Sequence, residues 1–495
     1  MESLLAQLGL DCSSLLLFLC IFLLVFDVVK YGNPKNFPPG PWPLPFIGDM
    51  HRLDPHNIHL QLAALSQKYG RIFSLRLFGV RVVVLNGYKV FREAIVVNAE
   101  DYMDRPNLPL LEEALRHRGL LMTNSYLWKK QRRFALHNLR NFGLGKRKLE
   151  PIIQEEANYL AETFDQHQGK PFDVHCHLHR AVANIIFRLL FAERFEYDDE
   201  KYHHILDLYN KIQDVQESAW VPIYNTIPWL LKWFPGPHQM FMTAMKSIIE
   251  FKAQKIKEHG QTLDPSSPRD YTDSFLIEMM QNIDRDAGFD VENLAFNTMD
   301  LALAGSVTTA TTLRWALKYI THDPHVQERV HAEIDAVIGT SRQPSIADRD
   351  NMPYTNAVIH ECQRMGNVLP LNVMHMTAKE TKLDKYTIPK GTLIIPSLDS
   401  VLHDDTVWET PHSFNPEHFL DKDGNFRRRD AFVPFSAGKR VCVGEQLARM
   451  ELFLFITTLM QRFSLSLPPG EQPSLEYTFG LVRRPKDSLL CAVPR

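Results

Sequence analysis

The residues best placed to do chemistry surround Cys442, in the segment FSAGKRVCVG at residues 435–444. An amphipathic helix is predicted directly after it, over residues 445–461. Glycines on both sides of the cysteine would let the backbone approach the sulfur closely. N–H groups at the helix start, together with the helix dipole, would favour the thiolate. A thiolate can bind a metal, and Arg440 could pair with an anionic group of the same ligand. The alternative is an inert buried cysteine at a turn.

This segment resembles the FxxGxRxCxG signature of the cytochrome P-450 family, and the chain matches every fixed position, including Phe435 and Gly438. The resemblance extends over essentially the whole chain. It is closest to the vertebrate microsomal family two, within which a J-like subfamily is one candidate. The stretch PPGP at 38–41, the run WKKQRRF at 128–134 and the ending LCAVP at 490–494 also look like that group.

The resemblance implies both a cofactor and a reaction. Members of the family carry haem b (iron protoporphyrin IX), and the position of Cys442 is that of the axial ligand of the iron. Thiolate ligation pushes electron density toward bound O2 and favours O–O cleavage. We therefore expect a monooxygenase that inserts one oxygen atom from O2 into a lipophilic small molecule. Its electrons would come from NADPH through NADPH-cytochrome P-450 reductase, with cytochrome b5 as a second candidate donor.

Basic and aromatic residues from distant parts of the sequence match the family's contacts to the haem propionates. Each could instead be an ordinary surface residue, but two carboxylates in a low-dielectric pocket need several donors. His375 follows Met374, whereas a proline usually precedes this histidine in the family. The expected cofactor-binding residues are Arg105, Trp128, Arg132, His375, Arg440, Phe435 and Gly438.

The segment AGSVTT at residues 304–309 aligns with the family's oxygen-activation motif. Thr308 would lie over the iron as a catalytic residue, and Gly305 would open a groove for O2. A hydroxyl in mid-helix usually bonds back to its own helix, so this role depends on the resemblance. Val307 replaces the acid that usually precedes this threonine, and Ser306 could provide a different proton relay. The same departure leaves room for an oxygen-independent isomerase of lipid hydroperoxides.

Glu361 and Arg364 lie three residues apart and so share one face of a helix. Such pairs are common on protein surfaces, where they contribute little. By resemblance this one is the family's buried ion pair, which locks the core behind the haem. The family often adds an arginine from a later PERF segment. This chain has PEHF at 416–419, with His418 in place of that arginine.

Residues 1–30 are predicted to form an N-terminal transmembrane anchor. An apolar run covers residues 15–26, and the stretch 8–29 could nearly span a bilayer. A cleaved signal peptide is the alternative, but the leading segment is acidic and no small-residue cleavage site follows. Basic residues after the run favour a cytosolic downstream part. The expected location is the endoplasmic reticulum membrane, with the catalytic domain on the cytosolic face.

A proline-rich linker over residues 31–48 should lead into one catalytic domain, residues 49–495. The net charge of −3 argues against nucleic acid as a partner. The irregular spacing of the cysteines argues against a disulfide framework. The expected architecture is mainly α with a minor β region, which by resemblance is the cytochrome P-450 fold. Helices are predicted over 88–97, 128–139, 149–166, 178–191, 240–258, 291–321 and 324–339, a β-hairpin over 73–85, and strands over 386–388 and 392–396.

Residues 115–149 contain no Asp or Glu but many Lys and Arg. A basic cluster is usually a solvated face or, in some proteins, a lipid-binding patch. By resemblance this one flanks the cysteine side of the haem, where it could steer an acidic flavoprotein reductase. The residues concerned are Lys129, Lys130, Arg133, Arg140, Lys146, Arg147 and Lys148, with Arg427, Arg428, Arg429 and Lys439 adding to the charge.

Two further segments have alternative interpretations. Residues 220–237 are apolar and aromatic, with prolines that break helices. They form either a buried loop or a second contact with membrane lipid, with Trp220, Trp229 and Trp233 at headgroup level. The sequence HCHLH at 175–179 resembles a metal cluster but lacks distant partners at zinc spacings. An ordinary polar loop or helix start is expected there.

Substrate contacts are expected from residues 107–121, 206–220, 298–307, 369–373 and 478–482. These segments are rich in Leu, Val and Phe, so an apolar or amphipathic substrate follows. Polyunsaturated fatty acids such as arachidonate, or lipophilic xenobiotics, are the leading classes. A haem-binding carrier or sensor without turnover remains as an alternative to an enzyme.

Overall fold

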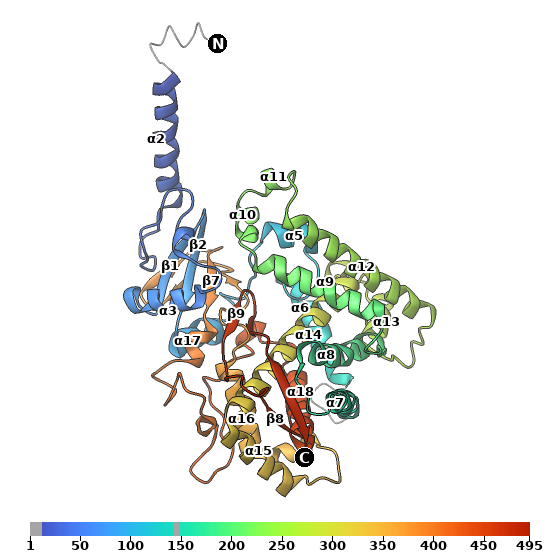
Figure 1. The fold of residues 1–495 in the computed structure, drawn as a ribbon. Helices are drawn as coiled ribbons and strands as arrows, with labels where there is room; N and C mark the ends of the chain where they lie inside the picture. Colours follow the sequence, from blue (N-terminus) through green and yellow to red (C-terminus); the bar gives the residue numbers. More distant parts are fainter. Residues whose placement is uncertain (1–11, 143–148) are drawn as a thin grey trace.

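The structure is a computed structural model that describes residues 12–142 and 149–495. Helices fill most of the body. Strands β1, β2 and β7 lie near the base of the N-terminal helix, whereas β8 lies at the far end of the body near the C-terminus (Figure 1). The predicted mainly α architecture with a minor β region is therefore confirmed. The α-helices are α2 (Cys12–Tyr31), α3 (Ile58–Tyr69), α4 (Tyr88–Phe91), α5 (Pro109–Leu115), α6 (Ser125–Asn141), α7 (Glu150–Asp165), α8 (His175–Phe191), α9 (Glu200–Glu217), α10 (Trp220–Thr226), α11 (Pro228–Leu231), α12 (Pro237–Gln261), α13 (Tyr271–Gln281), α14 (Val291–His322), α15 (Pro324–Val337), α16 (Pro353–Met365), α17 (Leu398–Leu402) and α18 (Glu445–Arg462). The strands are β1 (Ile72–Leu77), β2 (Val80–Leu85), β3 (Phe172–Asp173), β4 (His375–Met376), β5 (Thr381–Leu383), β6 (Tyr386–Ile388), β7 (Leu393–Pro396), β8 (Phe463–Ser466), β9 (Tyr477–Phe479), β10 (Arg483–Pro485) and β11 (Leu489–Pro494).

The longest helix, α14, runs through the middle of the body and organises its neighbours (Figure 1). The side chain of Asp290 starts it by accepting the N–H of Asn293, as an N-cap residue does. Helix α14 packs against α8 and α18, and most of its side chains are buried. Residues of α14 can therefore face either a packed helix or a central cavity.

The predicted helices all occur, and their ends differ from prediction where a local residue sets the boundary. Helix α12 begins at Pro237 rather than at residue 240, because a proline in the first turn gives up no helical hydrogen bond. Helix α8 begins at His175, so the HCHLH sequence is the helix start that was expected as one alternative.

The four-stranded sheet brings distant segments together in the order β1-β2-β7-β4. Strands β1 and β2 form the predicted hairpin, with Ile72 opposite Leu85. Strand β7 lies parallel to β2, and β4 pairs with β7 so that His375 lies opposite Ile394. The sheet thereby fixes the position of His375 beside the core.

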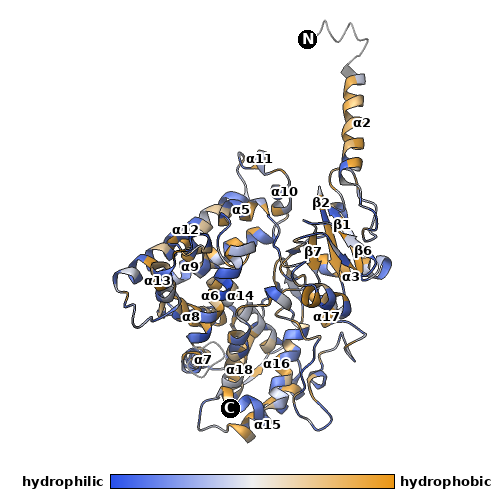
Figure 2. Ribbon diagram, turned by 180° about the vertical axis from the view of Figure 1, so that it is seen from behind, coloured by the Kyte–Doolittle hydropathy of each residue, from blue (hydrophilic) through white to orange (hydrophobic). Residues whose placement is uncertain are grey.

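The N-terminal helix α2 extends away from the body, and apolar residues cover its length (Figure 2). Its side chains are exposed, with Leu16 at 65% and Phe18 at 66%. Asp27 near its C-terminal end pairs with Arg76 of β1 at 2.9 Å, which ties the helix to the sheet. No helix within the described residues is both long and apolar enough to cross a membrane. The first eleven residues of the predicted anchor lie outside the described part of the chain.

Residues 220–237 form two short helices, α10 and α11, with prolines at their boundaries. Trp229 and Trp233 are 67% and 77% exposed, so a buried loop is wrong for this part of the segment. Trp220 differs from them, because its ring stacks on His238 and its Nε1 donates to that histidine at 3.3 Å. Only two of the three tryptophans are therefore free to contact a surface.

Candidate functional site

A largely apolar cavity lies between α14 and the loop that carries Cys442. Of the segments expected to contact a substrate, 107–121, 298–307 and 369–373 line it, whereas 206–220 and 478–482 do not. Helix α8 was not expected to contribute, yet it adds three aliphatic side chains. These are Ile186, Leu189 and Leu190.

Cys442 opens into this cavity from the loop before α18, and its backbone N–H donates to the carbonyl of Phe435 at 3.0 Å. The side chain is exposed to the cavity but lies deep within the protein. Burial raises the pKa of its thiol, whereas the N–H groups of Gly444 and Glu445 and the charge of Arg132 lower it. The donors expected at the helix start are thus present, but burial outweighs them. The donors act in the direction expected from the sequence, but in the chain alone they do not bring the pKa of the thiol below its ordinary value.

The glycines of the cysteine loop and of α14 differ in what a side chain at each position would meet. Gly438 has φ +71°, and a Cβ there would lie 1.9 Å from the carbonyl oxygen of Ile95. A Cβ on Gly444 would lie 3.9 Å from the Cys442 sulfur, which is an ordinary contact. A Cβ on Gly305 would lie 2.7 Å from Ile186, so this glycine permits α8 to approach α14. Gly305 also lines the cavity, and the groove for O2 expected there stays a prediction.

Three arginines meet at one side of the cavity. Arg105 donates to the carbonyls of Val373 and Met374, both at 2.8 Å. Arg440 donates to the carbonyls of Met103 and Thr123. Arg132 donates to the carbonyl of Val441, and the guanidinium of Arg440 lies 3.7 Å from the centre of the Trp128 ring.

These arginines are crowded, and no carboxylate within residues 12–142 and 149–495 forms an ion pair with them. Burial and then the charge of Arg132 lower the pKa of Arg105 to about 9. Burial and then the charges of Arg105 and Arg132 lower the pKa of Arg440 to about 8. Their observed partners are neutral carbonyls and amides, so a bound anion would relieve this repulsion. We call Arg105, Arg132 and Arg440 the basic rim.

His375 lies close to the basic rim and is 2% exposed. Its Nδ1 lies 2.6 Å from the carbonyl oxygen of Tyr102, whereas its Nε2 is buried without a hydrogen-bond partner among the described residues. Burial and then the charge of Arg105 lower the pKa of His375 well below its ordinary value. The Nε of Arg105 is also buried without a partner. Because the carbonyl oxygen of Tyr102 can only accept, Nδ1 carries the proton of the neutral ring, and Nε2 is left as an acceptor. The Nε of Arg105 is a buried donor that needs an acceptor, which a ligand can provide.

The two hydroxyls expected to act on oxygen occupy different positions. Thr308 lines the cavity and donates to the carbonyl of Ala304 at 2.8 Å. Ser306 is fully buried, is not among the cavity-lining residues described, and donates to the carbonyl of Ala302 at 2.7 Å. The structure thus brings Thr308 and Cys442 to one cavity and turns Ser306 away from it.

Asp300 of α14 also lines the cavity, and sequence reasoning missed it. Its Oδ2 accepts the N–H groups of Leu120 and Leu121, at 2.7 and 2.9 Å. Asn293, about two helical turns earlier on α14, accepts the N–H of Gly119 at 2.9 Å. One side of α14 therefore holds the loop that covers the cavity. The available signal was a single acid within the apolar stretch MDLALA at residues 299–304.

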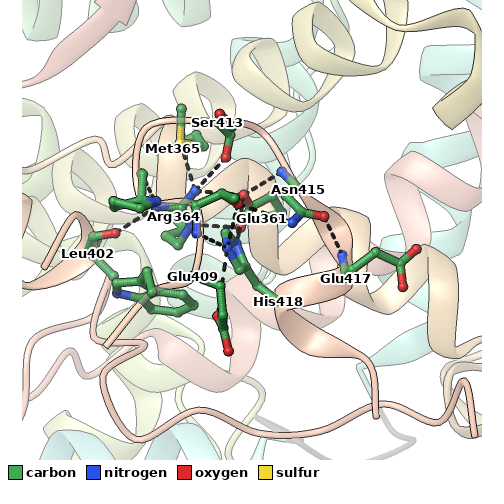
Figure 3. Close-up of polar contacts among 12 residues, drawn as sticks. Glu361, Arg364, Met365, Leu402, Glu409, Ser413, Asn415, Glu417 and His418 are labelled. Carbon is green, nitrogen blue, oxygen red and sulfur yellow. Dashed lines mark hydrogen bonds and ion pairs between the residues drawn. The ribbon is translucent and has the colours of Figure 1, made fainter. Parts of the chain in front are cut away.

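The expected ion pair between Glu361 and Arg364 is present and completely buried. Arg364 donates to both carboxylate oxygens at 2.7 Å, and neither side chain is exposed. His418 adds its Nδ1 at 3.3 Å from Glu361, and the N–H of Asn415 donates to the same carboxylate (Figure 3). Burial raises the pKa of Glu361, but the hydrogen bonds from Arg364 and His418 outweigh it, so the pKa is lowered. The cluster joins α16 to the segment before the cysteine loop.

Helix α6 carries basic residues on the face opposite its cavity side. Trp128 and Arg132 point inward, whereas Lys129, Arg133 and Arg140 are exposed. Lys130 lies 3.7 Å from Asp284. Elsewhere, Arg427 and Arg429 pair with Glu409, and Lys439 lies 3.7 Å from Glu100. The expected charges of Lys146, Arg147 and Lys148 lie outside the described residues.

One group of side chains within the described residues has the geometry of a metal site, and it is not the HCHLH sequence. It consists of His259, Asp270 and Asp273. Arg269 donates to both oxygens of Asp273 at 2.7 and 2.9 Å, so a guanidinium already neutralises this carboxylate. The group is an ion cluster that joins α12 to α13.

The structure combines two features: an internal cavity lined by a cysteine thiol and the basic rim, and a fully buried ion pair between Glu361 and Arg364. Together they define the class of this protein. A sequence model of the family Cytochrome P450 matches residues 38–492. The chain belongs to the cytochrome P450 family. It is therefore a haem b-binding oxidoreductase of the monooxygenase type, with a redox partner and a small-molecule substrate.

Its similarity to curated relatives covers nearly the whole length of each chain. It is 45% identical over 483 residues to cytochrome P450 2J2 of Homo sapiens, which is 97% of this chain and 96% of the relative. It is 44% identical to cytochrome P450 2J1 of Oryctolagus cuniculus, over 98% and 97% of the two chains. Cytochrome P450 2D26 of Rattus norvegicus is 43% identical, over 98% and 99%. The chain is thus a family-two, J-like member.

Proposed function

We propose that this monooxygenase inserts one oxygen atom from O2 into lipophilic molecules, with fatty acids such as arachidonate, or xenobiotics, as substrates. The observation that carries the proposal is that Cys442 and Thr308 open into one cavity lined mainly by aliphatic side chains. Such a cavity favours long apolar chains or rings over polar metabolites. Asp300 and Glu451 are the two acidic side chains among the described residues that line it.

Cys442 is the residue that would hold the haem iron, and the basic rim with His375 would hold the propionates. The unpaired Nε donor of Arg105 and the mutual repulsion of the three arginines support this fit. A propionate beside His375 would favour protonation of its Nε2, which could then donate. Since burial raises the pKa of the Cys442 thiol, coordination itself has to stabilise the thiolate. Trp128 would support the rim through Arg440, while Phe435 and Gly438 would shape the cysteine loop. The bound haem supplies the iron centre at which O2 is reduced, and a thiolate ligand favours O–O cleavage.

The side chains of the protein would orient the substrate, exclude water from the cavity and provide hydrogen bonds. Leu120 and Leu121 close one side of the cavity because Asp300 holds their backbone. Ile186 and Leu190 of α8 exclude water from another side. Thr308, whose hydroxyl donates to Ala304, keeps its oxygen lone pairs available toward the cavity. This arrangement would orient an apolar chain and offer one hydroxyl at the reacting end.

Electrons would arrive from NADPH through NADPH-cytochrome P450 reductase at the exposed face of α6, with cytochrome b5 as a second donor. The charges of Lys129, Arg133 and Arg140 support this docking surface, because the same helix contributes Trp128 and Arg132 to the cavity. Arg427 and Arg429 contribute less, since Glu409 offsets their charge.

The protein would sit on the endoplasmic reticulum membrane with its catalytic domain, residues 49–495, in the cytosol. Residues 1–30 would be the membrane anchor and residues 31–48 the linker. The exposed apolar side chains of α2 support the anchor, and α11 lies on the same side of the molecule (Figure 1). Trp229 and Trp233 would then reach the headgroup level.

The deciding experiment incubates the haem-loaded protein with reductase and NADPH across a panel of fatty acids and drugs under isotopically labelled O2. Incorporation of one labelled oxygen atom into a product supports the proposal. Absence of any oxygenated product, in protein with a normal spectrum after reduction under carbon monoxide, would contradict it.

A lipid hydroperoxide isomerase is the second candidate, and it would use neither O2 nor NADPH. Two features favour it: Val307 is aliphatic, and the hydroxyl of Ser306 donates to the carbonyl of Ala302 in its own helix, away from the cavity. Both leave the usual proton route without a donor. Conversion of a fatty-acid hydroperoxide without NADPH, with no labelled oxygen in any product, would select this alternative.

A further inference from the structure

A glutamate and an arginine one helical turn apart on α18 form an ion pair beside the cysteine loop. Glu445 is the first residue of α18, and Arg449 follows four residues later. Nε and Nη2 of Arg449 both lie 3.0 Å from the same carboxylate oxygen, Oε1 of Glu445. Both side chains are half-buried. Ion pairs at this spacing are common on helices, so the surroundings decide whether this one has a function.

Glu445 acts on the sulfur of Cys442 in two opposing ways. Its backbone N–H is one of the donors directed at the sulfur from the start of α18. Its carboxylate places a negative charge near the same atom. Burial is the main cause of the raised pKa of the Cys442 thiol, and the charge of Glu445 adds to it. Because like charges repel strongly where little water screens them, a cation that neutralises Glu445 favours the thiolate.

A buried histidine of α16 holds Arg449 in this position. Nη1 of Arg449 donates to Nε2 of His360 at 2.9 Å, and Nδ1 of His360 donates to the carbonyl of Asn356 at 2.7 Å. Burial and then the charge of Arg449 lower the pKa of His360 to about 3, so the ring is neutral and its Nε2 accepts. A neutral acceptor fixes the guanidinium without competing with Glu445 for its charge.

Aromatic rings connect this cluster to the cysteine loop. The guanidinium of Arg449 lies 5.0 Å from the centre of the Phe435 ring and 5.6 Å from that of Phe432. The rings of His360 and Phe432 lie 4.9 Å apart. Phe435 belongs to the cysteine loop, and its carbonyl accepts the N–H of Cys442. The cluster thus extends from α16 to the cysteine loop, with Arg449 between them.

We propose that Arg449 is a positioning residue for the thiolate of Cys442, because it neutralises the carboxylate of Glu445 and leaves the backbone N–H of that residue to act on the sulfur without an opposing charge. The inference rests on the proposed role of Cys442 as the ligand of the haem iron. Arg449 acts through Glu445 and does not itself touch substrate or the reacting atoms. Groups behind a metal ligand commonly change the properties of the metal in this way.

Two properties of the haem-loaded protein depend on this charge balance. An unpaired carboxylate at Glu445 adds negative charge near the iron, which disfavours the one-electron reduction of ferric to ferrous haem. It also makes the thiolate ligand less stable, so the thiolate-type Soret band should be lost faster after reduction under carbon monoxide. Both properties are measured without substrate and without turnover.

The test is a redox titration of Arg449→Gln, Glu445→Gln and the double variant in the haem-loaded protein. Arg449→Gln leaves the carboxylate unpaired, so the equilibrium should shift about tenfold toward ferric haem, which is about 59 mV for a one-electron couple. Glu445→Gln removes the negative charge and should shift the equilibrium toward ferrous haem. The double variant should lie close to the wild type, because neither member of the pair is left alone.

Two further variants distinguish an effect of charge from a loss of packing. Arg449→Lys keeps the charge but not the forked guanidinium, so most of the potential should recover even where thermal stability does not. Arg462→Gln is the matched control, at the last residue of α18 and about 20 Å further along the helix, and should leave the potential unchanged. Since the titration needs no reductase, a change in docking charge does not enter the result.

The outcomes separate this inference from the proposed function. Shifts of opposite sign in the two single variants, which cancel in the double variant, support the inference. A wild-type potential in Arg449→Gln, or shifts of the same sign in both single variants, overturns it. If Arg449→Gln does not retain haem, a wild-type potential in Glu445→Gln overturns it equally.

Two results for the wild type concern the proposed function. A thiolate-type spectrum without oxygenated product from any substrate would contradict monooxygenation and leave the role of Arg449 standing. Absence of the thiolate-type Soret band in folded, haem-loaded protein would contradict Cys442 as the ligand, and the inference would fail with it.

Discussion

Nδ1 of His418 lies 3.3 Å from a carboxylate oxygen of Glu361 that Arg364 already holds at 2.7 Å. His418 reaches further with its Nε2, which lies 2.9 Å from the hydroxyl of Thr410. Arg364 also donates to the carbonyls of Leu402, Pro411 and Ser413 (Figure 3). The buried pair thus fixes α16 against the end of α17 and against residues 411–418, which precede the cysteine loop.

Removing one member of this pair should destabilise the protein severely. Glu361→Gln leaves the guanidinium of Arg364 buried with half of its partner lost, and breaking such a pair costs about 3–5 kcal/mol. We expect a large fall in the midpoint of thermal unfolding and poor retention of haem. The matched control is Arg329→Gln, whose exposed pair with Glu417 should contribute at most about 1 kcal/mol. Equal losses in the two variants would contradict the structural role of the buried pair.

The pH dependence of stability should contain a contribution from Asp300. Burial raises the pKa of this carboxyl to about 6, although the N–H groups of Leu121 and Leu120 lower it. The folded protein then binds the proton more tightly than the unfolded chain. Tighter proton binding by Asp300 adds to the free energy of unfolding. This contribution is complete below the pKa of about 3.8 that the carboxyl has in the unfolded chain, and it is lost as the pH rises through about 6.

Asp300→Asn removes this pH dependence, because the amide oxygen can still accept both N–H groups. Above about pH 6 the variant should be more stable than the wild type by up to about 3 kcal/mol, and near pH 4 the two should converge. Denaturant unfolding at both pH values measures this. Asp300→Ala is the contrast, since it leaves two buried N–H groups unpaired and should cost about 1–3 kcal/mol. A stability difference that does not change with pH would argue against a neutral Asp300.

Periodicity in the sequence predicted most helices, because each α-helix has an apolar stripe that repeats with the helix turn. It could not place polar side chains in helices that are buried on every side. Helix α18 contains Glu451 within the run MELFLFITTLM, and almost all of that run is buried. A single acid in such a run signals a buried carboxyl, but which cavity it faces depends on tertiary packing. The resemblance placed Thr308 at the reacting site, and the structure puts it on the cavity, but the sequence did not reveal that Ser306 is absent from the described lining.

The matched cysteine segment predicted the position of Cys442 for a different reason. A segment that matches a family signature predicts the conformation of a loop, whereas helical periodicity predicts only helices. The contact of Gly438 with the carbonyl of Ile95 lies between parts of the chain more than 300 residues apart, and no local pattern encodes it. The electrostatic balance at the thiol was equally inaccessible, because it depends on burial.

Neutralising the exposed face of α6 should weaken electron delivery. Lys129→Gln with Lys130→Gln removes charges that steer an acidic reductase, so the second-order rate constant for reductase-driven turnover should fall several-fold at low salt. The difference should shrink as salt screens the attraction. The control is Lys246→Gln with Lys257→Gln on α12, where both side chains are exposed. An unchanged salt dependence in the α6 variant would assign the patch to another partner.

Removing the thiol of Cys442 should weaken haem binding while leaving the fold of the chain intact. Cys442→Ala keeps the backbone contact with Phe435 but leaves no axial ligand, so the basic rim alone would hold any haem. We expect most of the haem to be lost, and the remainder to lack the thiolate-type Soret band after reduction under carbon monoxide. Cys176→Ala, at an exposed cysteine on α8, should leave the spectrum intact. An unchanged spectrum in Cys442→Ala would refute the proposed ligand.

The tryptophans of the α11 region should contribute to membrane binding independently of the N-terminal anchor. In protein lacking residues 1–30, Trp229→Ser with Trp233→Ser removes two exposed indoles from the side of the molecule on which α2 lies. Interfacial aromatic rings favour the headgroup region, so the fraction bound to vesicles of neutral phospholipid should fall several-fold. Trp42→Ser, at an 85% exposed tryptophan in the linker, tests whether any exposed indole has the same effect.

Because Trp220 stacks on His238 within the body, Trp220→Ser should instead lower thermal stability and leave vesicle binding nearly unchanged. Equal vesicle binding by the wild type and the Trp229 and Trp233 double variant would leave the anchor as the sole membrane contact.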